Sequence, residues 1–160
     1  MCACDLGNIE IVDTLVRSGA DVNKVRQGNE SPLTYAVQGG YDNIVQYLIH
    51  AGAYVKHRQW NENTSLHLAI SLGLSSIASL LLDAEEEICS MKGAEGNTPL
   101  HLAVTLKNKD MITLLLIHNA DLEARNNEGN RPVDVAENLK LADIELVSRI
   151  SLLTKRKSGI

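Results

Sequence analysis

Histidines, cysteines and acidic residues are the side chains of this 160-residue chain best suited to metal binding or acid–base chemistry. His50, His57 and His118 are scattered and lack the short spacing that brings two ligands to one metal ion. No Ser/His/Asp or Cys/His set is arranged for nucleophilic catalysis, and Gly39-Gly40 ends a helix and is not part of a phosphate-binding loop. The sequence therefore predicts no catalytic residues, no metal site and no cofactor.

His67 and His101 differ from the other histidines because both lie in copies of one motif. The copies are Thr64-Ser65-Leu66-His67-Leu68-Ala69 and Thr98-Pro99-Leu100-His101-Leu102-Ala103, with related segments beginning at Ser31 and Arg131. The starting positions 31, 64, 98 and 131 are separated by 33, 34 and 33 residues. In the 98–103 copy a Thr suited to capping a helix precedes a Pro suited to the first helical position. A fixed period of this length predicts a solenoid of stacked units.

This period, together with Thr-Pro-Leu-His-x-Ala, resembles the ankyrin repeat. Residues 7–23 look like the family's second helix and exit loop, and residues 40–55 and 107–122 repeat that pattern. The resemblance covers nearly the whole chain. It implies an all-α solenoid of paired antiparallel helices with short β-hairpin-like loops. It also implies that His67 and His101 are structural and that the general function is protein recognition, without catalysis.

The expected organisation is a single domain over residues 1–154, followed by a flexible basic tail at 155–160. About five repeats are expected, at about 1–23, 24–56, 57–90, 91–123 and 124–154. The first is truncated, because counting back by the period places Met1 at the motif histidine. Ile11 and Leu15 do not supply the polar outer face that a terminal repeat needs, and neither do Cys2 and Cys4. The chain is therefore expected to be a fragment of a longer array, or to have an edge that something else covers.

The second helix of the fifth repeat is expected from about Leu141 to Leu153. There, Glu145, Ser148 and Arg149 replace apolar residues, which is typical of a C-terminal cap.

Composition narrows the class of partner and the compartment. The formal net charge of −5 argues against nucleic acid, which requires a basic binding face. No run reaches the length of a membrane span, and residues 1–5 do not resemble a secretory signal. Of the three cysteines, Cys2, Cys4 and Cys89, the first and last fall at core positions of the repeat, and an odd number of free thiols favours a reducing compartment. We expect an intracellular protein of the cytoplasm or nucleus that is not inserted in a membrane.

Several positions depart from the repeat pattern. Thr34 replaces the motif histidine, so the joint between repeats two and three is expected to be weaker. The exit loop of repeat three carries an inserted residue and reads Glu85-Glu86-Glu87, which indicates either a solvated loop or an acidic contact for a basic partner. Asn23 lies in a context similar to that of ankyrin asparagines that are hydroxylated, and its modification is an open hypothesis.

The resemblance also implies which residues contact a partner. These lie at the hairpin tips and at the end of each inner helix: Trp60, Asn61, Asn63, Gln38, Ser71, Leu72, Glu95, Asn97, Thr105, Leu106, Glu128 and Leu139. The only Trp falls on a tip, and exposed aromatics are enriched in binding hot spots. Leucine recurs eight residues after the motif start, at Leu6, Leu72, Leu106 and Leu139, which predicts an apolar stripe along the groove. The alternative is that these leucines pack between repeats. Gly39 interrupts the series and is expected to leave a gap.

The sequence therefore predicts a protein-binding module that contacts a protein or peptide through its concave groove and hairpin tips, as a scaffold or adaptor. One alternative is a regulatory or targeting part of a larger enzyme, channel or ubiquitin-ligase adaptor. We expect a monomer, and the other alternative is self-association through the uncapped first repeat.

Overall fold

The structure is a computed structural model, and it describes residues 2–26 and 28–139, with side chains from residue 3 onward. These residues form four helical hairpins and the first helix of a fifth, called units one to five here. The inner helices are α1 (Cys2–Asp5), α3 (Pro32–Gln38), α5 (Ser65–Ser71), α7 (Pro99–Thr105) and α9 (Pro132–Asn138). The outer helices are α2 (Ile9–Arg17), α4 (Asp42–His50), α6 (Ser75–Ala84) and α8 (Lys109–Ile117).

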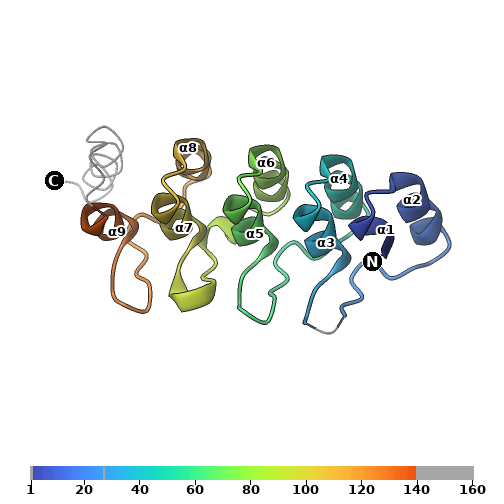
Figure 1. The fold of residues 1–160 in the computed structure, drawn as a ribbon, viewed down its shortest axis with the longest axis horizontal. Coiled ribbons are helices and arrows are strands. Elements are labelled where there is room, and N and C mark those ends of the chain that lie inside the picture. Colours follow the sequence, from blue (N-terminus) through green and yellow to red (C-terminus); the bar gives the residue numbers. More distant parts are fainter. Residues whose placement is uncertain (1, 27, 140–160) are drawn as a thin grey trace.

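The helices form two parallel layers. The inner helices lie side by side in one row, the outer helices form a second row, and hairpin loops project from the inner row on the side away from the outer helices (Figure 1). Each inner helix packs on the next, and each outer helix on the next, so every unit contacts only its neighbours. This arrangement confirms the predicted all-helical solenoid. Within the described residues, the inner helix of unit one has four residues and the other inner helices have seven.

Local sequence explains where the helices begin. Pro32, Pro99 and Pro132 take the first position of their inner helices, where a missing N–H costs nothing. Among the outer helices, the Asn8 and Asn108 side chains accept hydrogen bonds from the amides three residues later. These residues mark the starts of α3, α7 and α9 in the inner row and of α2 and α8 in the outer row.

Exit loops follow the outer helices and largely share one geometry. Gly19, Gly52 and Asn119 have φ values of +87°, +88° and +57°, the left-handed conformation expected after a helix end. Unit three differs, because Glu85 is extended and is followed by two short 3₁₀ helices, η1 (Glu86–Ser90) and, at the unit-four hairpin, η2 (Ala94–Gly96). The inserted residue in this loop is accommodated by η1.

The core is a continuous apolar layer between the two rows. Leu33, Leu66 and Leu100 from the inner helices are at most 1% exposed, as are aliphatic residues of α4, α6 and α8. The low aromatic content fits this thin layer of aliphatic side chains.

Two expectations concern parts of the chain outside the described residues. The second helix of unit five, with Glu145, Ser148 and Arg149, falls there, as does the basic tail at 155–160. None of the helices within residues 2–26 and 28–139 is both long and apolar enough to cross a membrane.

Candidate interaction surface

The hairpin tips repeat one backbone geometry in every unit after the first. The amides of Arg26, Gln59, Gly93 and Asn126 donate to carbonyls four residues later, at 2.7–3.0 Å. A residue with positive φ closes each turn, and these are Asn29, Glu62, Gly96 and Gly129. Because the turn is fixed by the backbone, the side chains at its corners are presented outward. Trp60 is one of them and is 80% exposed.

Two buried histidines join neighbouring units. Nδ1 of His67 accepts from the Thr64 amide at 3.2 Å, and Nε2 lies 3.1 Å from the Asn97 carbonyl of the next hairpin. His101 makes the same pair of contacts with Thr98 and Asn130. Burial lowers the pKa of His67 to about 4 and also lowers the pKa of His101, so both rings are neutral at pH 7. These contacts agree with the structural role expected for both histidines.

The joint between units two and three uses a different pair of side chains in place of the histidine. Thr34 stands at the motif position, and the ring of His57 lies 2.7 Å from the Asn29 carbonyl through Nε2. Asn29 Nδ2 in turn donates to the Arg58 carbonyl at 2.6 Å. Polar contacts therefore hold this joint too, although the motif histidine is absent.

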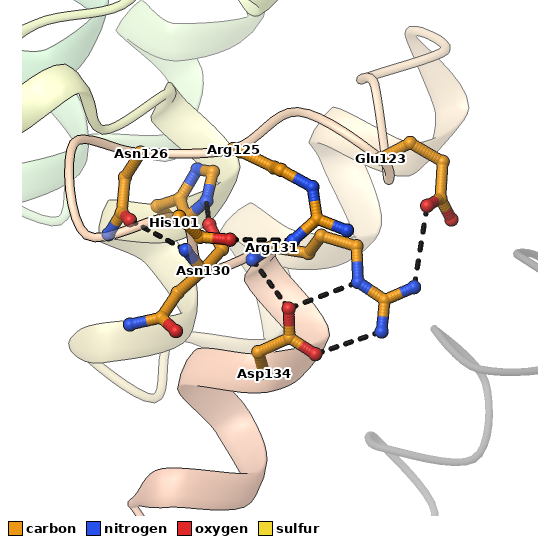
Figure 2. Close-up of polar contacts among 8 residues, drawn as sticks. His101, Glu123, Arg125, Asn126, Asn130, Arg131 and Asp134 are labelled. Atoms are coloured by element: carbon orange, nitrogen blue, oxygen red, sulfur yellow. Dashed lines mark hydrogen bonds and ion pairs between the residues drawn. The ribbon is translucent and has the colours of Figure 1, made fainter.

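Unit five replaces the threonine–histidine pair with an ion pair. Arg131 and Asp134 occupy the two motif positions, and Figure 2 shows the carboxylate of Asp134 beside the guanidinium of Arg131. The Asp134 carboxylate also accepts from the Arg131 amide at 2.8 Å, which caps α9, and Glu123 lies 3.3 Å from the same guanidinium. The Arg131 hydrogen bonds lower the pKa of Asp134 to about 2, so the cap stays charged. The motif periodicity placed Arg131 correctly, but it did not predict this exchange of partners.

The predicted leucine stripe is exposed. Leu72, Leu106 and Leu139 are the C-cap residues of α5, α7 and α9, and Leu6 follows α1. Their exposed fractions lie between 40% and 74%. The alternative of packing between units accounts at most for the covered part of these side chains, since each leaves 40% or more of its surface exposed.

The gap expected at Gly39 is absent. A Cβ built on Gly39 would collide with the ring of Tyr41, and a Cβ on Gly7 would meet the other edge of that ring. Tyr41 OH lies 3.4 Å from the Asp5 carbonyl, so the ring covers the space between units one and two. Tyr41 stands where Asn8 and Asn108 cap the other outer helices, and it makes no side-chain cap of its own. The expected opening beside Trp60 is therefore filled by the chain itself.

A second apolar row lies one turn before the stripe, at a repeat position that the sequence assigned to the core. Leu68, Leu102 and Val135 are half-buried and precede Leu72, Leu106 and Leu139 by four residues. Residues four apart share one face of a helix, so each pair forms a continuous apolar strip along its inner helix. The i, i+4 spacing in the sequence was the signal that could have revealed this row.

The predicted contact residues fall into two sets at opposite ends of the inner helices. Trp60, Asn61, Glu95 and Glu128 are exposed at the tips, and Gln38, Ser71, Leu72, Thr105, Leu106 and Leu139 are exposed at the helix ends. Asn63 and Asn97 are half-buried because their side chains bridge hairpins: Asn63 Oδ1 accepts from the Ala94 amide and Asn97 Oδ1 from Asn126 Nδ2. These two asparagines are therefore less accessible than expected.

The acidic side chains in the exit loop of unit three are paired with a lysine of the same chain. Lys56 Nζ lies 2.9 Å from Glu87 and 3.5 Å from Glu85. Asn119 Nδ2 donates to Glu86 at 3.4 Å. A loop with these internal partners fits the solvated-loop interpretation better than a contact reserved for a basic partner.

The remaining reactive side chains have structural partners. Asn23 donates to the Gly52 carbonyl and accepts from the Tyr54 amide, so its side chain bridges units one and two. Cys4 and Cys89 are buried, and Cys89 Sγ donates to the His118 carbonyl. In the part of the chain that the structure describes, no group of three or more His, Cys, Asp or Glu could hold a metal ion.

Comparison with known proteins agrees with this geometry. A family model described as ankyrin repeats (3 copies) matches residues 1–92 and residues 55–126. Rabankyrin-5 of Mus musculus is 36% identical over 158 residues, 91% of this chain and 13% of that protein. The probable 26S proteasome regulatory subunit p28 of Saccharomyces cerevisiae is 30% identical over 139 residues, 85% of this chain and 61% of that protein. The phosphocholine transferase AnkX of Legionella pneumophila is 25% identical over 165 residues, 98% of this chain and 17% of that protein.

The chain thus spans less than a fifth of two of these relatives and about three fifths of the third. The two family-model matches together cover residues 1–126, and the described units repeat one hairpin geometry. On this evidence, the chain belongs to the ankyrin-repeat family.

Proposed function

We propose that this chain binds a protein or peptide across its inner-helix face, between the hairpin tips and the leucine stripe. Ankyrin repeats are in general protein–protein interaction modules. The observation that carries the proposal is the exposure of Trp60 together with the series Leu72, Leu106 and Leu139. Apolar side chains that recur at one solenoid position and remain exposed mark an interaction site.

The hairpin tips on one side and the leucine stripe on the other are the two rims of this surface, and their separation sets the length that a partner must span. Trp60 precedes α5 and Leu72 ends it, and a seven-residue helix is about 10 Å long. Leu68 and Leu72 make the end of α5 apolar, and Leu102 and Leu106 do the same on α7. A partner segment with apolar side chains along one face, laid across α5 and α7, matches this surface.

The test is affinity capture with the whole chain and a Trp60→Ala, Leu72→Asp variant. The matched control is Tyr54→Ala, Ile117→Asp, which alters another exposed aromatic residue and another exposed aliphatic residue, away from the hairpin tips and the leucine stripe. We expect the parent and the control to retain the same partner and the rim variant to lose it.

Thermal unfolding checks that the substitutions act on the surface. All four side chains are exposed, so both variants should unfold within a few degrees of the parent, because exposed substitutions change stability by about 0.5 kcal/mol or less. Equal capture by the parent and the Trp60→Ala, Leu72→Asp variant would refute the proposed surface. A large fall in the melting temperature of that variant would show that Trp60 or Leu72 is not an exposed surface residue.

A second candidate function is that of a regulatory or targeting part in a longer protein. It is favoured by the small share of AnkX and Rabankyrin-5 that the chain spans. The same surface would then bind a segment of its own polypeptide or a target of that protein.

A further inference from the structure

Unit two lacks a leucine in the stripe, and an aromatic ring occupies the place of that leucine. Gly39 stands at the stripe position of unit two. A Cβ built on Gly39 would overlap Cδ2 and Cε2 of Tyr41, so the ring fills the space where the side chain of a leucine would begin. The Tyr41 ring therefore continues the apolar stripe between Leu6 of unit one and Leu72 of unit three.

The Tyr41 ring is held against the chain by both of its edges. The edge with Cδ2 and Cε2 lies against Gly39, and the edge with Cδ1 and Cε1 lies against Gly7, where a Cβ would be 2.5–3.0 Å from the ring. The hydroxyl lies 3.4 Å from the Asp5 carbonyl. Tyr41 is nevertheless half-buried and not fully buried. Because both edges and the hydroxyl meet the chain, the part of the ring left open is a face.

Two exposed acidic residues adjoin this ring. Asp5 provides the carbonyl that the Tyr41 hydroxyl approaches, and Asp42 follows Tyr41 as the first residue of α4. At the repeat position of Asp5 the other units have uncharged residues: Gln38, Ser71, Thr105 and Asn138. A carboxylate next to the stripe at this position is therefore specific to unit one.

The helices around the ring carry no basic side chain that would balance these carboxylates. Residues 2–16 and 32–49 contain four Asp or Glu residues and no Lys, Arg or His. Arg17 follows in α2, and its Nε lies 2.9 Å from Asp13. Lys24 and Arg26 precede α3, at the opposite end of that helix from Gly39. The stripe is therefore acidic where it crosses units one and two.

We propose that Tyr41 determines which partner this surface accepts, by taking a lysine or arginine side chain of the partner on its open ring face, beside Asp5 and Asp42. The inference rests on the proposed function, because it assigns one contact within the same surface. The face of an aromatic ring attracts a cation, and the neighbouring carboxylates strengthen that attraction. The apolar part of the partner then lies over Leu72 and Leu106, so its basic end is at units one and two.

The test uses a phage-displayed library of random linear peptides, selected on the whole chain. Peptides that bind the parent but not the Trp60→Ala, Leu72→Asp variant are kept, because they occupy the proposed surface. We expect these peptides to carry Lys or Arg at one end of an apolar segment. Fluorescence polarisation of the synthetic peptides then gives Kd, and replacing the basic residue by Gln should weaken binding to the parent about fivefold.

Variants of the chain show whether Tyr41 and Asp5 cause this discrimination. An Asp5→Asn, Tyr41→Leu variant should bind the basic and the Gln peptides within about twofold of each other, whereas Tyr41→Phe, which keeps the ring, should still discriminate. A merely structural role for Tyr41 would weaken both peptides equally. Asp110→Asn, at an exposed acidic residue of α8, is the control and should match the parent. Asp5→Asn alone keeps the test decisive if the double variant does not fold.

The outcomes separate this inference from the proposed function. Selected peptides that depend on Trp60 and Leu72 but lack a basic residue would overturn the inference and leave the proposed function standing. Equal discrimination by the parent and the Asp5→Asn, Tyr41→Leu variant would do the same. A selection that yields no peptide dependent on Trp60 and Leu72 would overturn both.

Discussion

The two buried histidines show how single residues hold this solenoid together. Each neutral ring accepts from a threonine amide in its own unit and contacts a carbonyl in the next, so the joint depends on an uncharged imidazole. The repeated Thr-x-x-His spacing was enough to predict their structural role. It was not enough to predict His57 and Asn29 at the joint that lacks the motif histidine, because these side chains meet only once the hairpins are stacked.

The buried histidines predict a loss of stability in mild acid. The pKa of His67 is about 4 in the folded chain against 6.5 for a free histidine, so the unfolded chain binds a proton first as the pH falls. Its neutral ring contributes stability fully above pH 6.5, and this contribution is lost between pH 6.5 and 4. The shift corresponds to about 3 kcal/mol at pH 4. Urea unfolding measured at intervals from pH 7 to 4 should show the fall.

The histidine responsible can be identified by substitution. His67→Gln is expected to be less stable than the parent at pH 7, because it loses the capping contact, but to lose less stability on acidification. His50→Gln, at an exposed position on α4, is the control and should follow the parent. Identical acid sensitivity in the parent and His67→Gln would show that other groups are responsible.

At the scale of the helical elements, position in the repeat predicted most of the structure, and exceptions occurred where one side chain reaches across units. The starts of α3, α5, α7 and α9 follow from the motif, and the exit-loop glycines mark the ends of two outer helices. The expected gap at Gly39 was wrong because the large ring of Tyr41 can leave its own helix start and lie over two glycines. A repeat pattern compares equivalent positions within each unit, so it does not reveal a side chain that lies over residues of a neighbouring unit.

The absence of a side chain at Gly39 and the large ring of Tyr41 therefore depend on each other, and paired substitutions can test this dependence. Gly39→Leu alone should destabilise the chain by about 1–3 kcal/mol, because the new side chain forces the Tyr41 ring to move. Adding Tyr41→Asn should recover that loss, since it removes the ring and supplies the asparagine cap found at Asn8 and Asn108. The φ of −78° at Gly39 allows any L-residue, so backbone strain does not enter.

Denaturant unfolding of the two single variants and the double variant measures this coupling. Gln38→Leu is the control, because it adds a leucine at the neighbouring exposed position without meeting the ring. Additive effects of Gly39→Leu and Tyr41→Asn would contradict the pairing.

For the whole molecule, stability should vary along the stack. Each unit contacts only its neighbours, so local opening reflects how many neighbours a unit has and how much apolar surface it buries with them. Unit one has a four-residue inner helix and leaves Ile11 and Leu15 half exposed, whereas α6 in unit three buries Ile77, Ala78, Leu81 and Leu82. The amides of α2 should therefore exchange faster than those of α6.

The variant Val12→Ala tests whether this gradient arises from local opening. Val12 is 3% exposed in unit one, so removing its methyl groups weakens the packing of α2 and leaves units three and four untouched. If the end unit opens by itself, hydrogen exchange followed by mass spectrometry should show faster exchange in α2 and unchanged exchange in α6 and α8. If the stack instead unfolds as one cooperative body, the substitution should speed exchange of the most protected amides in all three helices by the same factor. Selective acceleration in α2 would place the weakest point of the stack at the face that carries Ile11 and Leu15.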